Sequence, residues 1–285
     1  MEELFSSFHP QFVYHAAAYK HVPMMELSPS EAILTNVGGT KLIADLATKY
    51  HVQRFVMVST DKAVNPTNVM GDSKRLAEMY VQGLAATSTL TKFITTRFGN
   101  VLGSNGSVIL RFKDQIAQGG PVTVTHPNII RYFMTIPEAT QLVLEAGSMG
   151  NGGEIFVFDM GKPVPIVDLA RKMIRLSGLV PGVDIDIKYT GLRPGEKLYE
   201  ELLNDAENTL PTHHEKILIA KVREASVTNI EQEFLELFQL ASSADNIMSM
   251  VAKMKELVPE FLSNNSVFEQ LDGNNATVVS INKVG

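Results

Sequence analysis

The sequence of 285 residues contains no cysteine. This absence excludes disulfides and thiolate chemistry, and it is typical of proteins that work in a reducing compartment. The sequence also has no apolar run near the ~18 residues needed to cross a bilayer, and its first residues resemble no signal peptide. We therefore expect a cytoplasmic protein with no membrane segment.

An excess of positive charge is also missing, because the formal net charge is −6 at pH 7. There is thus no basic field for a nucleic acid, and a phosphorylated ligand must be held by a few placed cations. We assign no metal site. With 45% hydrophobic residues, the chain can bury a large core in one big or two modest domains.

A glycine-rich dinucleotide loop is not found where one would be expected. A dinucleotide-binding fold normally starts with a strand, a G-x-x-G-x-x-G turn and, about twenty residues later, an acidic ribose ligand. None of these precedes residue 10. Residues 99–106 have a similar glycine spacing, but the strand expected at residues 122–125 is followed by His126 and Pro127 and by no acidic ribose ligand. We therefore reject this loop as the cofactor loop.

The most informative segment is residues 55–80. Residues 55–59 are apolar and β-branched, as in a buried parallel strand, whereas Leu76, Met79 and Tyr80 follow at helical spacing. The polar residues between them therefore lie at the carboxyl end of a strand, where open α/β sheets bind ligands. Taken by residue type alone, the favoured interpretation is a strand, a polar turn and a helix with solvated lysines.

The pattern S-T-D-K-A-x-x-P-x-x-x-M-G-x-S-K in this segment resembles the active site of the extended short-chain dehydrogenase/reductases, in their nucleotide-sugar 4,6-dehydratase branch. The resemblance extends over about residues 5–223. It implies catalytic roles for Thr60, Asp61, Lys62 and Lys74. Met70 stands where this superfamily usually has its catalytic tyrosine, a departure that a subset of the branch shares.

The resemblance implies an NAD site and a UDP-sugar site. The H-A-A-A-x-K-H-V-P string after the first strand lies near the dinucleotide in the family, although its histidines could also be ordinary buried or surface residues. The residues implied for the cofactor are His15, Ala16, Ala17, Asn36 and Lys74. Those implied for the substrate are Lys20, Asn100, Ser104, Thr123, Arg131 and Arg193. Arg97 belongs to neither set, because we expect its side chain to be structural and to pair with a nearby carboxylate.

A second family string, G-x-R-P-G-E-K-x-x-E-E, occupies residues 191–201. We expect a turn at Pro194 and Gly195 and a helix from Glu196 onward. Arg193 would then precede a helix N-terminus and could clamp a diphosphate. A surface turn with a solvated arginine is the alternative.

The expected fold class is α/β: an NAD-binding Rossmann domain, a doubly wound parallel sheet that lacks its first strands here, with a smaller C-terminal α/β substrate-binding lobe. We assign residues 1–105 and about 150–163 to the first, and residues 106–149 and 164–223 to the lobe. Residues 224–262 should form C-terminal helices, and residues 263–285 a frayed polar tail.

The activity implied by the resemblance is UDP-N-acetylglucosamine 4,6-dehydration with NAD, with Asp61 as acid and Lys62 as base. Asp61 would have to be protonated and Lys62 neutral. Thr60, with Asp61 or a water linked to Lys74, would relay the proton of the C4 hydroxyl. A homo-oligomer is the family expectation. The alternatives are an inactive fragment that binds UDP-sugar or pairs with a full-length partner, and a nucleotide-sugar epimerase, which needs no acid–base pair for elimination.

Overall fold

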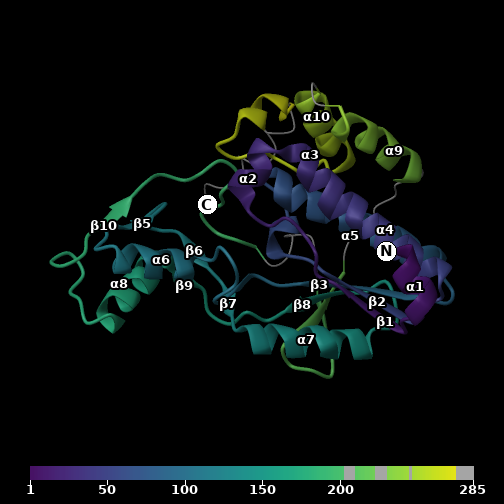
Figure 1. Ribbon diagram of the computed structural model, residues 1–285, viewed down its shortest axis with the longest axis horizontal. Coiled ribbons are helices and arrows are strands. Elements are labelled where there is room, and N and C mark those ends of the chain that lie inside the picture. Colours follow the sequence, from purple (N-terminus) through teal and green to yellow (C-terminus); the bar gives the residue numbers. More distant parts are fainter. Residues whose placement is uncertain (202–208, 222–229, 244–245, 274–285) are drawn as a thin grey trace.

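The computed structural model describes residues 1–201, 209–221, 230–243 and 246–273. A six-stranded sheet organises these residues, in the order β1-β2-β3-β8-β12-β11 (Figure 1). The parallel part consists of β1 (Phe12–His15), β2 (Arg54–Val58), β3 (Lys92–Arg97) and β8 (Ile155–Phe158). Strand β12 (Ile217–Ala220) pairs antiparallel with β8, and β11 (Thr209–Pro211) antiparallel with β12. The parallel strands joined by helices confirm the α/β class.

Successive side chains of β2 point to opposite faces of the sheet and pack against helices on both. Phe55 and Met57 of β2 lie in the core shared with α4 (Gly39–Lys49) and α5 (Val69–Thr87), whereas Val56 packs with α7 (Ile136–Met149) on the other face. This period of two is the pattern of a strand buried on both sides. The edge strand β1 is preceded by α1 (Glu2–Phe8).

Residues 29–49 are helical in three successive parts. Helix α3 (Pro29–Ala32) continues into a π-helical turn, η1 (Ile33–Gly38), and then into α4. A short helix that the sequence did not suggest, α2 (Val22–Leu27), comes before it. Outside this layer lie the two predicted C-terminal helices, α9 (Ile230–Ala241) and α10 (Ile247–Leu257), which contact η1, α3 and α5.

The smaller lobe has its own core. Strands β5 (Val122–Val124) and β10 (Ile187–Tyr189) pair in parallel, and α6 (Val108–Ala117) and α8 (Ile166–Leu176) pack on them. Two short pairs connect the lobe to the main sheet. They are β4 (Asn100–Val101) with β7 (Phe133–Met134), and β6 (Ile130–Arg131) with β9 (Val164–Pro165).

Several expectations need correction. We assigned helix α7 and strand β12 to the lobe. Strand β12 instead belongs to the main sheet, and α7 packs on the face of this sheet that is lower in Figure 1. Residues 196–201 form no helix. Their carbonyls are taken by other partners, since Arg131 donates to the oxygens of Lys197 and Leu198 at 2.7 and 3.2 Å. The first part of the polar tail is ordered and includes η3 (Val267–Leu271), while residues 274–285 lie outside the described residues.

Across the residues that the structure describes, no helix combines the length and apolar character required to span a membrane.

Candidate active site

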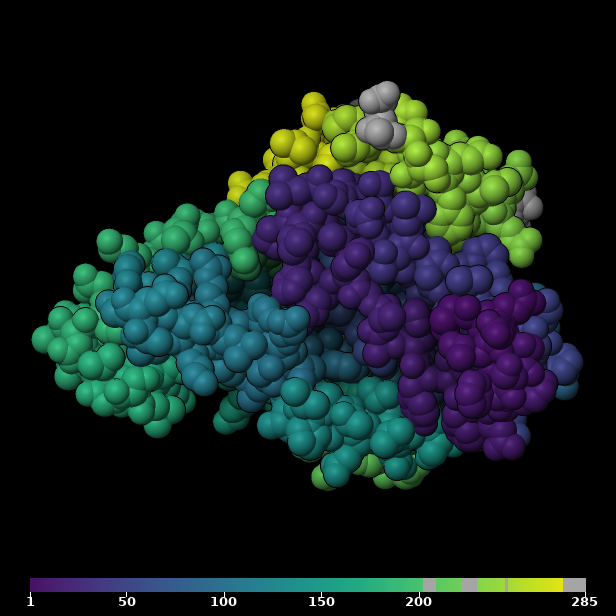
Figure 2. Space-filling model, viewed as in Figure 1, coloured from purple at the N-terminus to yellow at the C-terminus, as the bar shows by residue number. Residues whose placement is uncertain are grey.

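A cavity of about 440 Å³ opens between the carboxyl ends of β2 and β3 and the lobe. In Figure 2 the surface is hollowed between the teal and green lobe and the purple N-terminal segment. Most of the predicted site residues line this cavity: Ala16, Lys20, Thr60, Lys62, Met70, Lys74, Asn100, Ser104, Thr123, Arg131 and Arg193. His15, Ala17, Asn36 and Asp61 are not among the lining residues.

The turn after β2 places three polar residues in sequence. Thr60 is the N-cap of a 3-10 turn, η2 (Asp61–Ala63), and its hydroxyl accepts a hydrogen bond from the amide of Lys62. The same hydroxyl donates to Asp61 Oδ1 at 2.8 Å. Because the Asp61 side chain is 1% exposed, its carboxyl lies behind the wall of the cavity, one hydrogen bond from it through Thr60. We had expected Asp61 to face the substrate directly.

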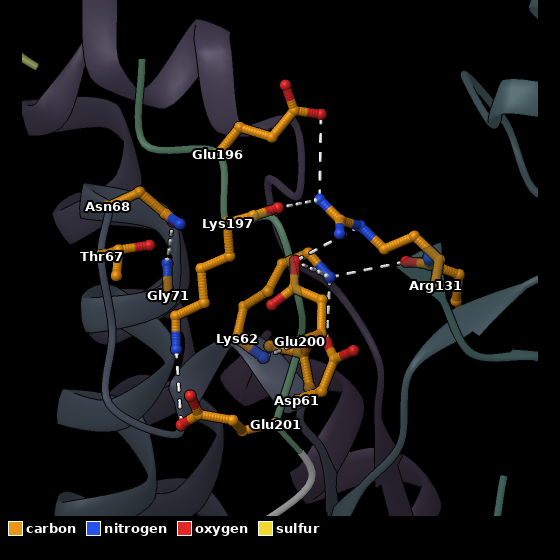
Figure 3. Close-up of polar contacts among 12 residues, drawn as sticks. Asp61, Lys62, Thr67, Asn68, Gly71, Arg131, Glu196, Lys197, Glu200 and Glu201 are labelled. Atoms are coloured by element: carbon orange, nitrogen blue, oxygen red, sulfur yellow. Dashed lines mark hydrogen bonds and ion pairs between the residues drawn. The ribbon is translucent and has the colours of Figure 1, made fainter. Parts of the chain in front are cut away.

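Lys62 lies between two carboxylates, as Figure 3 shows. Its Nζ is 2.9 Å from Asp61 Oδ1 and 3.4 Å from Glu200 Oε1, and it is 3.5 Å from the amide oxygen of Asn100. The side chain of Glu200 is 3% exposed, and its Oε2 has no hydrogen-bond partner among the described residues. The cavity wall therefore carries one ammonium group that is shared by two buried acids.

Burial and charge act in opposite directions on these three groups. Burial raises the pKa of Asp61, the Lys62 ammonium opposes this, and Glu200 adds to it. For Lys62, burial disfavours the ammonium, but Asp61 and Glu200 outweigh it and its pKa is raised. For Glu200, burial favours the neutral acid, but Lys62 and Arg131 outweigh it and its pKa is lowered. The direction for Asp61 agrees with our expectation, whereas Lys62 is held charged without ligand, contrary to the neutral form that we expected.

Lys74 differs from Lys62 in having no hydrogen bond or ion pair to a described residue. It lies in the first turns of α5, is 4% exposed and lines the cavity. Burial lowers its pKa to about 8, against the opposing charge of Glu78. Such a buried and unpaired cation is suited to the hydroxyls or the anion of a bound molecule. Met70, one turn earlier, is 3% exposed and offers the cavity only a thioether.

His15 and Asn36 support the cavity from behind. Thr40 donates to the carbonyl of Asn36 at 2.6 Å, so His15 Nε2, 3.0 Å from the same hydroxyl, must be the donor in that pair. Burial lowers the pKa of His15 to about 4, and Lys74 adds to this, which keeps the ring neutral. Asn36 uses both amide hydrogens on Tyr19 O and Ser73 Oγ and accepts from Tyr19 N. These two residues thus position the loop that carries Ala16 and Lys20.

The predicted substrate residues approach the cavity from both sides. Lys20 donates to Ser104 Oγ at 3.1 Å, which joins the loop after β1 to the loop before α6. Gly106 lies against His21, since a Cβ there would be 2.2 Å from the imidazole. Thr123 is held by Gln115 through both its amide and its hydroxyl.

Arg131 is committed to the protein. Its guanidinium donates to the carbonyls of residues 130, 197 and 198 and is 3.5 Å from Glu200 Oε1 and 3.8 Å from Glu196 Oε1 (Figure 3). These contacts make Arg131 a clamp on residues 196–200 in the free protein, and its expected contact with the substrate stays a prediction. Arg193 is more available, because its side chain is 46% exposed and, within the described part of the chain, it forms an ion pair with Glu196 alone, at 3.2 Å.

Arg97 pairs with a buried carboxylate, as expected. Its Nε and Nη2 donate to Glu78 at 2.9 and 2.7 Å, and Ser59 donates to the same carboxylate at 2.6 Å. These contacts tie the end of β3 and the residue after β2 to α5. The arrangement keeps the Thr60-Asp61-Lys62 turn and Lys74 in fixed relation.

Sequence reasoning missed Glu200 and the support from Asn68. Asn68 caps α5 by accepting from the amide of Gly71 at 2.8 Å, and it donates to the carbonyl of Gly195 at 2.9 Å. An asparagine just before a helix is an N-cap signal that the sequence does carry. The two glutamates at residues 200 and 201 gave no indication of which one is buried.

Comparison with known proteins places the chain in a family. The family model described as "Polysaccharide biosynthesis protein" matches residues 1–222. The capsular polysaccharide biosynthesis protein CapD of Staphylococcus aureus is 58% identical over 229 residues, which are 80% of this chain and 38% of that protein. The chain thus spans less than half the length of this relative.

Solved structures agree with the fold. The structure of Pen from Bacillus thuringiensis is 36% identical, with a TM-score of 0.68, over 75% of this chain and 67% of that one. A dTDP-glucose 4,6-dehydratase of Streptomyces venezuelae, DesIV, solved as a double mutant with NAD and DAU bound, has a TM-score of 0.64 at 20% identity, over 72% of this chain and 68% of that one. The latter likeness concerns the fold alone. The resemblance first seen in two motifs is confirmed: this chain belongs to the polysaccharide biosynthesis protein family and has the Rossmann-like fold of the extended short-chain dehydrogenase/reductases.

Proposed function

We propose that this chain carries the active site of a nucleotide-sugar 4,6-dehydratase that acts on a UDP-hexosamine, specifically UDP-N-acetylglucosamine. The observation that carries the proposal is the Thr60-Asp61-Lys62 turn. Two of its side chains line the cavity, and the carboxyl between them lies 2.8 and 2.9 Å from their polar atoms. Elimination of water needs an acid that protonates the leaving hydroxyl at C6 and a base that removes the proton at C5. This turn supplies both groups.

The cofactor in this proposal is NAD. The unpaired ammonium of Lys74 fits the ribose hydroxyls of such a molecule, with the loop at Ala16 beside it. When bound, NAD supplies reversible oxidation at C4 of the sugar and reduction at C6. Neutral His15 behind this loop adds no second positive charge next to Lys74.

The protein's own groups perform the proton transfers. The proton of the C4 hydroxyl passes through the Thr60 hydroxyl to Asp61, a route that the 2.8 Å hydrogen bond supports and that replaces the tyrosine absent at Met70. Asp61 returns this proton, again through Thr60, to the C6 hydroxyl, which leaves as water. Lys62 removes the C5 proton, the resulting ammonium exchanges with solvent, and Lys62 later delivers a solvent-derived proton to C5.

Lys62 must be neutral when it takes the C5 proton. In the free protein, two carboxylates raise its pKa. Protonation of Asp61 removes one of these two negative charges, so we expect the pKa of Lys62 to fall at the step where a base is required. The adjacency of the two groups therefore couples oxidation at C4 to proton removal at C5.

The substrate's diphosphate and sugar would be held from the lobe side. Lys20, Ser104, Asn100 and Arg193 line that part of the cavity and can donate hydrogen bonds to its oxygens. Arg193 has the geometry for a bidentate contact with phosphate. Among the described residues, six lysine and arginine side chains and two glutamates line the cavity, and this excess of positive charge suits a ligand with a small number of negative charges.

The test is turnover of UDP-N-acetylglucosamine in D₂O with NAD, followed by NMR of the product. The wild-type protein should form the 4-keto-6-deoxy sugar and incorporate deuterium at C5. Lys62→Met should abolish this incorporation, because no group then removes the C5 proton. Lys41→Met is the matched control, since Lys41 pairs with Asp45 and does not line the cavity.

Three results would contradict the proposal. Full deuterium incorporation by Lys62→Met would remove Lys62 from the role of base. Interconversion at C4 without loss of water would show an epimerase instead. A wild-type protein that holds NAD and leaves UDP-hexosamines unchanged would reject both activities.

A further inference from the structure

A segment beyond the family match crosses the rim of the candidate site. Residues 262–266, here called the strap, follow α10 and lie between the turn at residues 66–68 and the loop at residues 192–196. In Figure 1 this yellow end of the chain lies beside α2 and α10. The family model ends at residue 222, so the match says nothing about the strap.

On one side, the strap pairs with the turn that leads into α5. The amide of Leu262 donates to the carbonyl of Pro66 at 3.1 Å, and the amide of Asn264 donates to that of Thr67 at 3.2 Å. This turn follows the catalytic residues and ends in Asn68, the N-cap of the helix that carries Lys74. The strap is therefore fixed to the catalytic side of the cavity.

On the other side, the strap holds the loop that carries Arg193. The carbonyl of Asn264 accepts from the amide of Gly195 at 2.7 Å, and Asn264 Nδ2 donates to the carbonyl of Glu196 at 2.8 Å. Asn265 Nδ2 donates to the carbonyl of Leu192 at 2.7 Å. Arg193 thus has a strap contact on each side of it along the chain, although the strap itself does not line the cavity.

The strap is anchored at both of its ends. Lys255 of α10 donates to Ser263 Oγ at 2.8 Å and pairs with Asp272. Ser266 Oγ donates to Glu26 at 2.5 Å, and the other oxygen of this carboxylate accepts from the amide of Val69 at 2.8 Å. An element fixed to α10, α2 and α5 can hold a loop that has no helix of its own.

The loop and the turn also touch directly, so their spacing leaves little freedom. A Cβ at Gly195 would lie 2.4 Å from the Cβ of Asn68. Thr67 Oγ1 donates to the Gly195 carbonyl at 3.1 Å. Because the loop packs directly on the turn, a small shift of the loop moves Arg193 relative to the turn and to the cavity.

We propose that the strap is a positioning element for substrate binding and that Asn264 is its main residue, acting through Arg193. This inference deepens the proposed function and rests on it for the identity of the substrate. Release of the loop should weaken the hold of Arg193 on the substrate's diphosphate. It should leave the Thr60-Asp61-Lys62 turn in place, because this turn makes its own contacts with Phe98, the residue after β3, and with Glu200.

The test is a double-mutant cycle between Asn264 and Arg193. Asn264→Ala removes one hydrogen bond to the loop, and we expect KM for UDP-N-acetylglucosamine to rise about three- to tenfold with kcat changed less than about twofold. In an Arg193→Ala background, Asn264→Ala should add little further, because the residue through which it acts is gone. Gln270→Ala is the control, since this exposed residue contacts η3 and not the loop.

An unchanged KM in Asn264→Ala, or full additivity with Arg193→Ala, would overturn the inference. Asn265→Ala, which releases the loop only at Leu192, should raise KM in the same sense and serves if Asn264→Ala does not fold. Hydrogen exchange at residues 192–196 separates this inference from the proposed function, because it needs no turnover. Faster exchange there in Asn264→Ala supports the strap even if UDP-sugars are not substrates, and unchanged exchange rejects it.

Discussion

Replacement of Lys74 by methionine should make the protein more stable and less active. Lys74 is 4% exposed and has no hydrogen bond or ion pair within the described part of the chain. Burial lowers its pKa from 10.5 to about 8. At 1.36 kcal/mol per pKa unit this shift corresponds to roughly 3 kcal/mol by which the buried ammonium opposes folding. Methionine has a similar length and carries no charge, so Lys74→Met removes this cost.

The pH dependence has a defined sign. A lysine whose pKa is lowered in the folded state binds fewer protons there than in the unfolded chain, so folding stability rises with pH between the two values. The cost is fully present below pH 8, shrinks between about pH 8 and 10.5, and vanishes above the unfolded pKa. The gain from Lys74→Met should follow the same course.

The assay is denaturant unfolding of wild type and variant from pH 7 to 10, together with NAD binding and turnover. Lys113→Met, at an exposed position of α6, should change stability by less than about 0.5 kcal/mol at every pH. A Lys74→Met protein that is less stable than wild type at pH 7 would refute the reasoning. A gain that does not decline toward pH 10 would also refute it, since the gain would then come from apolar packing and not from the lost charge.

Two further predictions concern the turn that we propose to be catalytic. In Gly71→Ala, the new Cβ would lie 2.2 Å from the carbonyl oxygen of Lys62, so we expect a loss of about 1–3 kcal/mol of stability and slower turnover. Gly83→Ala in the same helix, where nothing lies within 4 Å, should be neutral or stabilising by up to about 1 kcal/mol; equal effects in thermal unfolding would contradict this. Glu200→Gln removes one of the two carboxylates that raise the pKa of Lys62, so the acidic limb of C5 deuterium exchange should move to lower pH. An unmoved limb in the pH profile would show that Glu200 does not influence the base.

The elements that the sequence predicted well are those specified by near neighbours. The strand at β2 and the helix at α5 follow from an apolar run and from Leu76, Met79 and Tyr80 at helical spacing, and all three side chains are buried. The predicted helix from Glu196 was wrong because a distant arginine on β6 takes the carbonyls that the helix would have needed.

The sequence by itself determined the α/β class, the family and the group of residues gathered near the cavity, because periodicity and contiguous motifs express local geometry. Only the tertiary structure decided that Asp61 lies behind Thr60, that Glu200 shares Lys62, and that Asn264 holds the loop of Arg193. These relations join residues as far as 138 positions apart, as Lys62 and Glu200 are. No local pattern encodes them, because the burial and charge of each partner arise only when the segments pack together.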